Sequence, residues 1–233
     1  YRGLSKQNYI KMLDRYKGYK QAIICGGGPS LTNLKKDFSQ LMINSLVVVC
    51  NGIYRLKEIY KEKKPDIYIL QDNSWLIEDY RMELNQIIKY VKDEDMFLCV
   101  NERWLPVLCS LYDDLENNII GLREVEKNTF PSVDNLSYTE STNVVTSIAI
   151  PITSSLVDKI FFIGCDGMDN GNWTHAYTGR ETEEFVPPQV VLPYDYCIDN
   201  FEYNSSLDEL YKRVLEYGES LNKNYYSLTH YMN

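Results

Sequence analysis

The chain has 233 residues, which suits one large domain, and its formal charge at pH 7 is −9. Hydrophobic residues make up 44% of the chain and charged residues 24%, so it can bury a core and is not expected to be disordered. Binding along a nucleic acid needs clustered Lys and Arg to neutralise phosphates, and this acidic balance argues against such a partner.

The apolar segments are too short to cross a membrane. The longest, such as 46–50 and 160–163, have the length of a strand, whereas a membrane span needs about 20 apolar residues in a row. No secretory signal pattern opens the sequence. We therefore expect a cytoplasmic protein, acting in the cytosol or at the inner face of the membrane. Because the sequence starts at Tyr1 rather than Met, we also expect it to be part of a longer chain.

The cysteine pattern favours a reducing compartment. None of the six cysteines forms a CxxC pair, and three of them lie in or at the end of strand-like apolar runs. Such residues are typical of small buried hydrophobic side chains, and no metal site is predicted from them. The six are Cys25, Cys50, Cys99, Cys109, Cys165 and Cys197.

Short apolar runs alternate with amphipathic segments along the chain. An N-terminal helix is expected over 4–17, within a segment 1–19 that precedes a nucleotide-binding domain over 20–233. Strands are expected at 21–25, 46–50, 66–71, 96–100, 159–163 and 224–228, and helices between them at 31–42, 53–63, 76–92, 102–115, 142–155 and 206–222. This alternation predicts an α/β fold, a Rossmann-like and mostly parallel sheet with helices on both faces.

One long segment breaks the alternation. Residues 165–203 show little periodicity but contain several Gly, Pro and aromatic residues. A long stretch of this kind inside a compact domain is usually a functional lid or a disordered insert, and the aromatic residues favour a lid.

A glycine run follows the first predicted strand and precedes a predicted helix. Glycine has no Cβ, so the backbone N–H groups of Gly26, Gly27 and Gly28 can approach an anion, and the helix N-terminus adds partial positive charge. Ser30 can cap the helix or donate its hydroxyl to the same phosphate. The run is neither G-x-G-x-x-G nor a Walker A loop, whose lysine it lacks. It predicts a site for a nucleotide phosphate; the alternative is a tight turn without a ligand.

Neutral hydrogen-bonding residues stand at the other strand ends, where parallel sheets collect their ligands. Each one alone could equally be a cap or a turn residue. Together they surround one cleft with no strong Lys or Arg, Arg55 being the nearest basic group, and this suits a nucleoside monophosphate diester better than a triphosphate. The neutral residues are Asn51, Asn73, Ser141 and Thr142, and the acidic Asp166 follows the predicted strand at 159–163.

The order of these motifs resembles the bacterial lipooligosaccharide sialyltransferases. The resemblance runs from about Gln21 to Thr229, and its specific part is the GGGPSL run. The same order is similar to that of the motility-associated flagellin glycosylation proteins and the archaeal 6-hydroxymethylpterin pyrophosphokinase-like proteins. The supporting segments are Cys50-Asn51 with Tyr54, Asp72-Asn73-Ser74, Ser141-Thr142-Asn143 and Gly164-Cys165-Asp166.

The resemblance implies transfer of sialic acid from CMP-sialic acid, without a metal, on one Rossmann-like domain with a lid. It implies that Asp166 shapes the site near the ribose or base, while the other residues contact the cytidine monophosphate. These others are Gly28, Ser30, Asn51, Asn73, Ser141 and Thr142.

The catalytic residues depart from that pattern. The sialyltransferases carry a histidine general base shortly before the last helix, and the matching stretch 201–206 has no histidine here. The first candidate is His175 in the expected lid, because an imidazole with a pKa of ~6.5 can take a proton from an acceptor hydroxyl; the alternative is an ordinary loop histidine. His230 is the second candidate. The sialyltransferases also use lid tyrosines to assist the phosphate leaving group, and the candidates here are Tyr177, Tyr194, Tyr196 and Tyr203, with Tyr177 and Tyr203 preferred.

The sequence thus predicts a metal-independent glycosyltransferase without a cofactor. Its donor would be a CMP-activated sialic or other nonulosonic acid, and its acceptor a surface glycan or glycoprotein. One alternative is a pyrophosphokinase-like phosphoryl transferase, with Mg²⁺ held by Asp72, Asp166 and Asp169. Another is a non-catalytic nucleotide-binding domain of a larger glycan-assembly protein. A homo-oligomer and flanking domains both stay open.

Overall fold

A computed structural model describes the backbone of residues 1–112, 114–141, 143–165 and 201–228, and the side chains of these residues except Ser74 and 201–208. Most of the expected lid, 165–203, therefore lies outside the described residues. The described part is built on one eight-stranded sheet with the strand order β6-β5-β4-β3-β2-β1-β7-β8.

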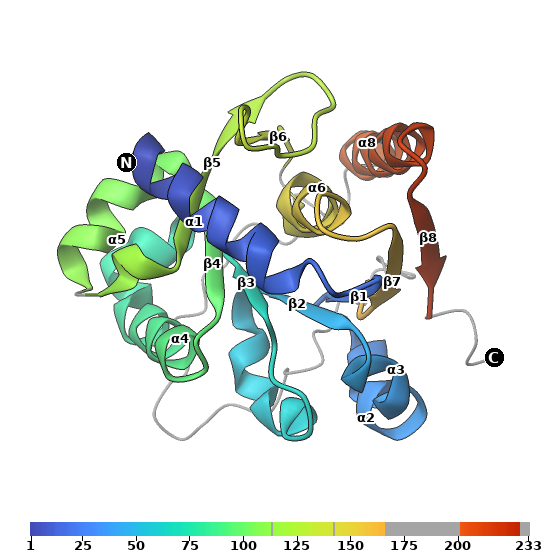
Figure 1. Ribbon diagram of the computed structural model, residues 1–233, viewed down its shortest axis with the longest axis horizontal. Coiled ribbons are helices and arrows are strands. Elements are labelled where there is room, and N and C mark those ends of the chain that lie inside the picture. Colours follow the sequence, from blue (N-terminus) through green and yellow to red (C-terminus); the bar gives the residue numbers. More distant parts are fainter. Residues whose placement is uncertain (113, 142, 166–200, 229–233) are drawn as a thin grey trace.

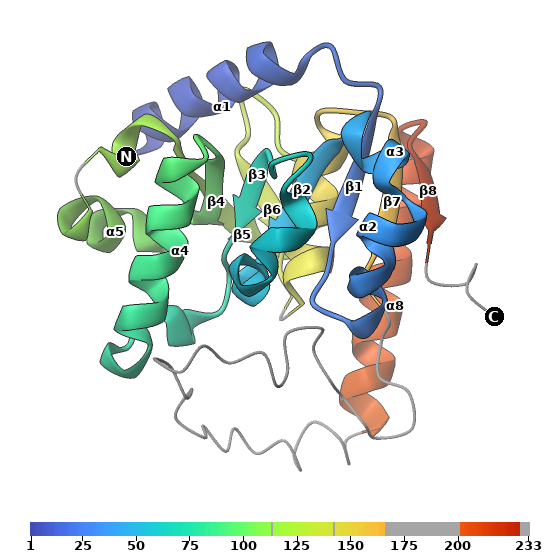
Figure 2. The same cartoon turned by 90° about the horizontal axis from the view of Figure 1, so that it is seen from below.

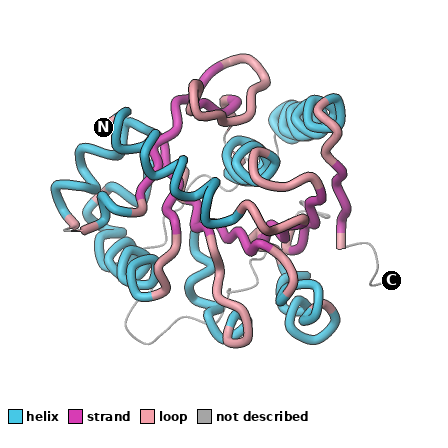
Figure 3. The backbone as a smooth tube through the Cα atoms, in the orientation of Figure 1, coloured by secondary structure: helices cyan, strands magenta, loops and turns pink. Residues whose placement is uncertain are grey.

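Every neighbouring pair of strands in this sheet is parallel. The strands are β1 (Gln21–Cys25), β2 (Leu46–Cys50), β3 (Ile67–Ile69), β4 (Phe97–Asn101), β5 (Ile119–Val125), β6 (Ser137–Thr139), β7 (Lys159–Ile163) and β8 (Asn224–Ser227). All five residues of β2 are buried. A strand that is apolar on both sides needs cover on both faces of the sheet, and Figures 1 and 3 show helices on both. The expected α/β fold class is confirmed.

Helices of different lengths cover the two faces of the sheet. α6 and α8 lie on one face, and α2, α3 and α4 lie on the other (Figure 1). The α-helices are α1 (Arg2–Tyr16), α2 (Leu34–Asp37), α3 (Ser39–Ile43), α4 (Arg81–Asp93), α5 (Leu105–Leu111), α6 (Ile150–Ser154) and α8 (Phe201–Ser220). The short helical turns are η1 (Pro29–Asn33), η2 (Asn51–Tyr60), η3 (Asn73–Leu76), η4 (Glu78–Tyr80), η5 (Glu102–Trp104), η6 (Leu115–Asn117) and the π-helical η7 (Val145–Ala149).

The chain order reverses beside β1. From β1 the chain moves outward strand by strand to β6, then returns through η7 and α6 to β7, on the other side of β1. Such a topological switch point opens a crevice outside the carboxyl ends of the two strands. The fold therefore places the turns after β1 and β7 at the position where α/β sheets bind ligands.

The sequence did not predict β5 or β6. The apolar run of β5 is interrupted by Gly121, which is required because a Cβ there would lie 2.4 Å from a methyl carbon of Leu105. The backbone N–H of Gly121 donates to the hydroxyl of Ser5 in α1 at 2.9 Å. The expected helix at 31–42 is also different, because it is divided into η1, α2 and α3.

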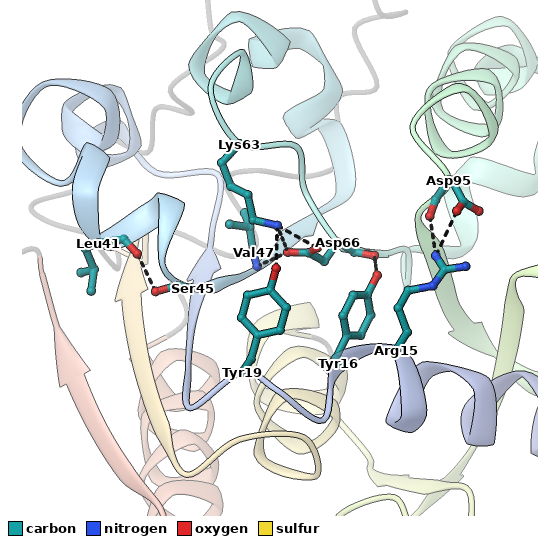
Figure 4. Close-up of polar contacts among 9 residues, drawn as sticks. All are labelled: Arg15, Tyr16, Tyr19, Leu41, Ser45, Val47, Lys63, Asp66 and Asp95. Atoms are coloured by element: carbon teal, nitrogen blue, oxygen red, sulfur yellow. Dashed lines mark hydrogen bonds and ion pairs between the residues drawn. The ribbon is translucent and has the colours of Figure 1, made fainter.

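The opposite, amino-terminal end of the sheet, called the amino edge here, is closed by a polar cluster around Asp66 (Figure 4). The Asp66 carboxylate accepts from Lys63 Nζ at 2.7 and 2.8 Å and from the backbone N–H of Val47 at 2.8 Å. The hydroxyl of Tyr16, in the last turn of α1, donates to the Asp66 carbonyl at 2.9 Å. Arg15 pairs with Asp95 at 3.2 Å. These bonds fasten α1 across the start of β2 and β3.

Candidate functional site

The candidate site lies at the carboxyl edge, which we define as the ends of β1, β2, β3 and β7 with the turns that follow them. Figure 2 shows β1 running toward this edge, with α2 just beyond its end. All the described members of the predicted nucleotide-binding set stand on these turns or at the start of η7.

The glycine run after β1 interlocks with the turn after β7. The N–H of Gly26 donates to the Ile163 carbonyl at 2.8 Å, and the N–H of Gly28 donates to the Gly164 carbonyl at 2.7 Å. In return, the N–H of Gly164 donates to the hydroxyl of Ser30 at 2.9 Å. Three donor groups of this edge are therefore used to join the two turns.

Two of these glycines are required by the close approach of the two turns. A Cβ on Gly26 would lie 2.3 Å from the Gly164 carbonyl oxygen, and a Cβ on Gly164 would lie 2.3 Å from the Gly26 carbonyl oxygen. Gly164 also has a φ of +68°, in the left-handed region. Gly28 has extended backbone angles, φ −74° and ψ 165°. Hydrogen bonds and close contact thus hold the turns after β1 and β7 together at the carboxyl edge. The phosphate-binding role of Gly26, Gly27, Gly28 and Ser30 stays a prediction.

Asn51, the first residue after β2, is the most unusual residue of this edge. Its φ is +49°, which is uncommon for any residue other than glycine. Its side-chain oxygen Oδ1 is buried and has no hydrogen-bond partner among the described residues. A buried acceptor without a donor is costly, so each such group needs an explanation, and a bound ligand is one. Asn51 therefore offers an unpaired hydrogen-bond acceptor at the carboxyl edge.

A glutamine joins β3 to the start of η7. The side-chain amide of Gln71 donates to the Ser141 carbonyl, and its oxygen accepts from the hydroxyl of Ser147. Gln71 is not among the predicted site residues, because a glutamine at a strand end belongs to no distinctive motif. Asn73, two residues further on, is exposed, and its Oδ1 accepts from the indole N–H of Trp104 at 3.0 Å.

The start of η7 is capped by its own side chains. The hydroxyl of Ser141 accepts from the N–H of Asn143 at 3.0 Å, and Asn143 Oδ1 accepts from the N–H groups of Val145 and Thr146 at 2.9 and 3.2 Å. Thr142 lies outside the described residues. The π-helical turn that follows is a form found often at functional sites. Ser141 thus lies at the carboxyl edge, with its hydroxyl acting as a cap.

The basic group nearest this edge is already paired. Arg55 forms an ion pair with Glu83, whose side chain is 1% exposed, and the hydroxyl of Tyr54 donates to the same carboxylate at 3.2 Å. Burial raises the pKa of Glu83, while the positive charge of Arg55 lowers it. The pair fixes η2 against α4.

The buried thiols are not suited to nucleophilic catalysis. Cys25, Cys50 and Cys99 are 0–3% exposed, as the sequence predicted. Burial raises the pKa of Cys25 to about 12, and it raises that of Cys50 well above its usual range. A thiol is nucleophilic only when ionised, so these two remain inert.

A cavity of about 290 Å³ opens elsewhere, beside the amino end of α1 on β5. Three strands separate β5 from β1. Two cations at its wall are paired, Arg2 with Glu102 at 3.7 Å and Lys6 with Asp134 at 3.3 Å. We assign it no function.

The predicted catalytic residues cannot be placed relative to this edge. His175, Tyr177 and Asp166 lie outside the described residues, as does His230, and only the backbone of Tyr203, in α8, is described.

Within the described part of the chain, no three His, Cys, Asp or Glu side chains cluster as metal ligands would. Among the described helices, none combines the length and apolar character of a membrane span.

Comparison with known proteins gives two structural relatives. No family model matches the chain, and no curated protein matches it. The monofunctional alpha-2,3-sialyltransferase Cst-I from Campylobacter jejuni matches with a TM-score of 0.52 and 17% identity, over 91% of this chain and 76% of that one. The sialyltransferase CstII from the same organism, in complex with the substrate analogue cytidine-5′-monophosphate, matches with a TM-score of 0.47 and 16% identity, over 90% and 79% of the two chains. The chain therefore shares the α/β fold of Cst-I, a bacterial sialyltransferase, as its motif order predicted.

Proposed function

We propose that this chain is a glycosyltransferase that transfers a sugar from a CMP-activated donor, a sialic or other nonulosonic acid, to a hydroxyl of a surface glycan or glycoprotein. The observation that carries the proposal is the unpaired acceptor of Asn51 at the end of β2, the strand beside β1, in a fold shared with a sialyltransferase. The donor nucleotide would supply the missing hydrogen bond.

The chemistry of the carboxyl edge supports a monophosphate diester. Asn51, Asn73 and Ser141 offer neutral hydrogen-bonding groups, and Arg55 is held by Glu83. A triphosphate site normally provides lysine or arginine and Mg²⁺ to balance its charge. The residues proposed to bind the nucleotide are Gly26, Gly27, Gly28, Ser30, Asn51, Asn73, Ser141, Thr142 and Asp166.

In the proposed reaction an acceptor hydroxyl attacks the anomeric carbon of the donor sugar. His175 takes the proton of that hydroxyl as a general base. The bond between the anomeric carbon and the phosphate oxygen breaks, and CMP leaves with the bonding electron pair. Tyr177 and Tyr203 donate hydrogen bonds to the departing phosphate, whose developing charge they stabilise. His175 is proposed from its imidazole and its place in the expected lid, whereas the roles of Tyr177 and Tyr203 derive from the sequence resemblance.

A thermal-shift panel of CMP, CDP, UDP, GDP and ATP, each with Mg²⁺ or with EDTA, tests the proposal, because a ligand that binds only the folded state raises the apparent stability. We expect CMP or CDP to give the largest shift, and EDTA to leave that shift unchanged. Release of CMP from CMP-sialic acid in the presence of a glycan acceptor then tests the transfer itself.

The other outcomes point to other functions. A larger shift with ATP and Mg²⁺ would overturn the proposal in favour of a phosphoryl transferase. Binding of CMP without any transfer would favour a nucleotide-binding domain of a larger glycan-assembly protein.

A further inference from the structure

A buried tyrosine lies directly against the backbone of Asn51. Tyr68, in the middle of β3, is 0% exposed. Its hydroxyl donates to the carbonyl oxygen of Asn51 and accepts from the N–H of Tyr54 at 3.3 Å. The hydroxyl therefore links backbone groups at the two ends of the first turn of η2.

A phenol at this position needs an explanation. The strand neighbours Ile67 and Ile69 are apolar and fully buried, and an apolar residue would fill the same space without a polar group to satisfy. Burial raises the pKa of Tyr68 well above its usual range. The hydroxyl therefore keeps its proton and always acts as the donor to the Asn51 carbonyl.

This bond fixes the conformation of Asn51. A left-handed backbone is unfavourable for most residues with a side chain; asparagine adopts it more readily than most, and contacts from the surroundings help to hold it. Tyr68 holds the carbonyl from the core side, and the side-chain oxygen lies in a buried place where no donor of the described residues reaches it. The unfavourable backbone and the unpaired oxygen thus occur in one residue, and one hydroxyl from β3 secures it.

We propose that Tyr68 is a positioning residue of the nucleotide site: its hydroxyl holds Asn51 in the left-handed conformation in which Oδ1 accepts a hydrogen bond from the bound nucleotide. This inference rests on the proposed function. The group that Asn51 accepts from must be a donor, so it is a ribose hydroxyl or the amino group of the base, and the ionised phosphate is excluded. Tyr68 itself touches no ligand.

The test is Tyr68→Phe, which removes one hydroxyl and keeps the ring. We expect the affinity for CMP to fall about tenfold or more, while the circular dichroism spectrum is retained. Tyr16→Phe is the matched control, because Tyr16 is also buried and donates its hydroxyl to a backbone carbonyl, that of Asp66, at the amino edge. The control should lose comparable stability but keep its CMP affinity.

A double-mutant cycle separates positioning from general destabilisation. If Tyr68 acts through Asn51, then Asn51→Ala with Tyr68→Phe binds CMP no more weakly than Asn51→Ala alone. Fully additive losses of affinity would overturn the inference. Equal losses in Tyr68→Phe and Tyr16→Phe would overturn it too, because both would then report stability only.

Ligand variants identify the donor group. Loss of affinity for 2′-deoxy-CMP or 3′-deoxy-CMP in the wild type, but not in Asn51→Ala, indicates a ribose hydroxyl; the same pattern with UMP indicates the base amino group. A loss that is equal in both proteins for all three analogues contradicts the assignment to Asn51.

A measurement without ligand keeps this inference distinct from the proposed function. If no nucleotide stabilises the wild type, the proposed function fails. The carbon chemical shifts of Asn51 then decide whether Tyr68 holds its backbone: they should leave left-handed values in Tyr68→Phe but not in Tyr16→Phe. Unchanged shifts would refute the positioning role.

Discussion

At the amino edge of the sheet the Asp66 carboxylate accepts hydrogen bonds from Lys63 and Val47, whereas at the carboxyl edge Asn51 Oδ1 accepts none from the part of the chain that the structure describes. Both groups stand at ends of central strands, β3 and β2 respectively. The amino edge uses its polar groups to fasten α1 to the sheet, with Tyr16 and Lys63 contributing (Figure 4).

Residues with positive φ occur at both edges. The carboxyl edge contains Asn51 at +49° and Gly164 at +68°, and the amino edge contains Asp95 at +52°. Gly164 is locked to Gly26 by close contact, and Asn51 is held by Tyr68. The difference between the edges therefore lies in their buried polar groups: Asp66 accepts from Lys63 and Val47, and Asn51 Oδ1 has no donor among the described residues. An unpaired buried acceptor at the end of the strands where parallel sheets bind ligands supports the carboxyl edge as the proposed site.

Among the substitutions that test the contrast between the two edges, Gly164→Ala is expected to lower the free energy of unfolding most. The new Cβ would lie 2.3 Å from the Gly26 carbonyl oxygen, in a backbone conformation that alanine rarely adopts. We expect a loss of about 3 kcal/mol in the free energy of unfolding, measured by urea denaturation, and weaker nucleotide binding because the turn after β1 must move.

Gly18→Ala is the control, because no atom lies within 4 Å of the added Cβ. Its stability should stay within about 0.5 kcal/mol of the wild type. A Gly164→Ala variant as stable as this control would mean that the two turns are not interlocked.

A smaller effect is expected from Lys63→Met at the amino edge. Burial raises the pKa of Asp66 above its usual value, and Lys63 lowers it; without Lys63 the folded-state pKa rises further. The variant then loses about 2 kcal/mol at pH 7, where the buried carboxylate is charged and lacks its cation. A raised pKa in the folded state means that the fold binds the proton more tightly, so this loss shrinks as the pH falls through the pKa of Asp66.

Urea denaturation at pH 4 and pH 7 checks the sign of this effect. CMP affinity should be unchanged, because the amino edge lies at the far end of the strands from the proposed site. If the variant lost more stability at pH 4 than at pH 7, the charged form of Asp66 would not be the cause of the loss. If the variant also bound CMP more weakly, the two edges would not act independently.

Most of the sheet could be predicted from continuous apolar runs. The ranges of β1, β2 and β7 coincide with the predicted ones, because each is a short and mostly apolar run with distinct polar flanks; β2 is buried throughout, and β7 keeps Lys159 exposed at its start. β5 was missed because Gly121 interrupts its apolar run. The glycine is there because the Leu105 side chain of α5 packs against it, and this contact between two elements cannot be read from the residues of the strand alone. β6 was missed because it is only three residues long and polar, Ser137–Thr139.

The carboxyl edge was predicted as a set of residues but not as an arrangement. Chain order alone gave Asn51 and the glycine run, because turns after parallel strands meet at one edge. It could not give the interlock of Gly26 with Gly164, since they are far apart in the sequence and meet only because β7 returns beside β1. Tyr68 was also hidden, because within its strand it reads as one more large core residue.

The smallest and most diagnostic effect is expected from Asn51→Gly. Glycine adopts a φ of +49° without the penalty of a side chain, and the substitution also removes the buried unpaired oxygen. We expect the free energy of unfolding to rise by about 0.5–1 kcal/mol, and the affinity for CMP to fall. Asn222→Gly is the matched control: Asn222 has a φ of +62° and is exposed after α8, so it should gain stability without losing affinity. Thermal unfolding with and without CMP separates the two results. If Asn51→Gly gained stability and kept full affinity for CMP, the Asn51 side chain would have no part in binding. The main structural observation for a nucleotide site at the carboxyl edge would then no longer support it.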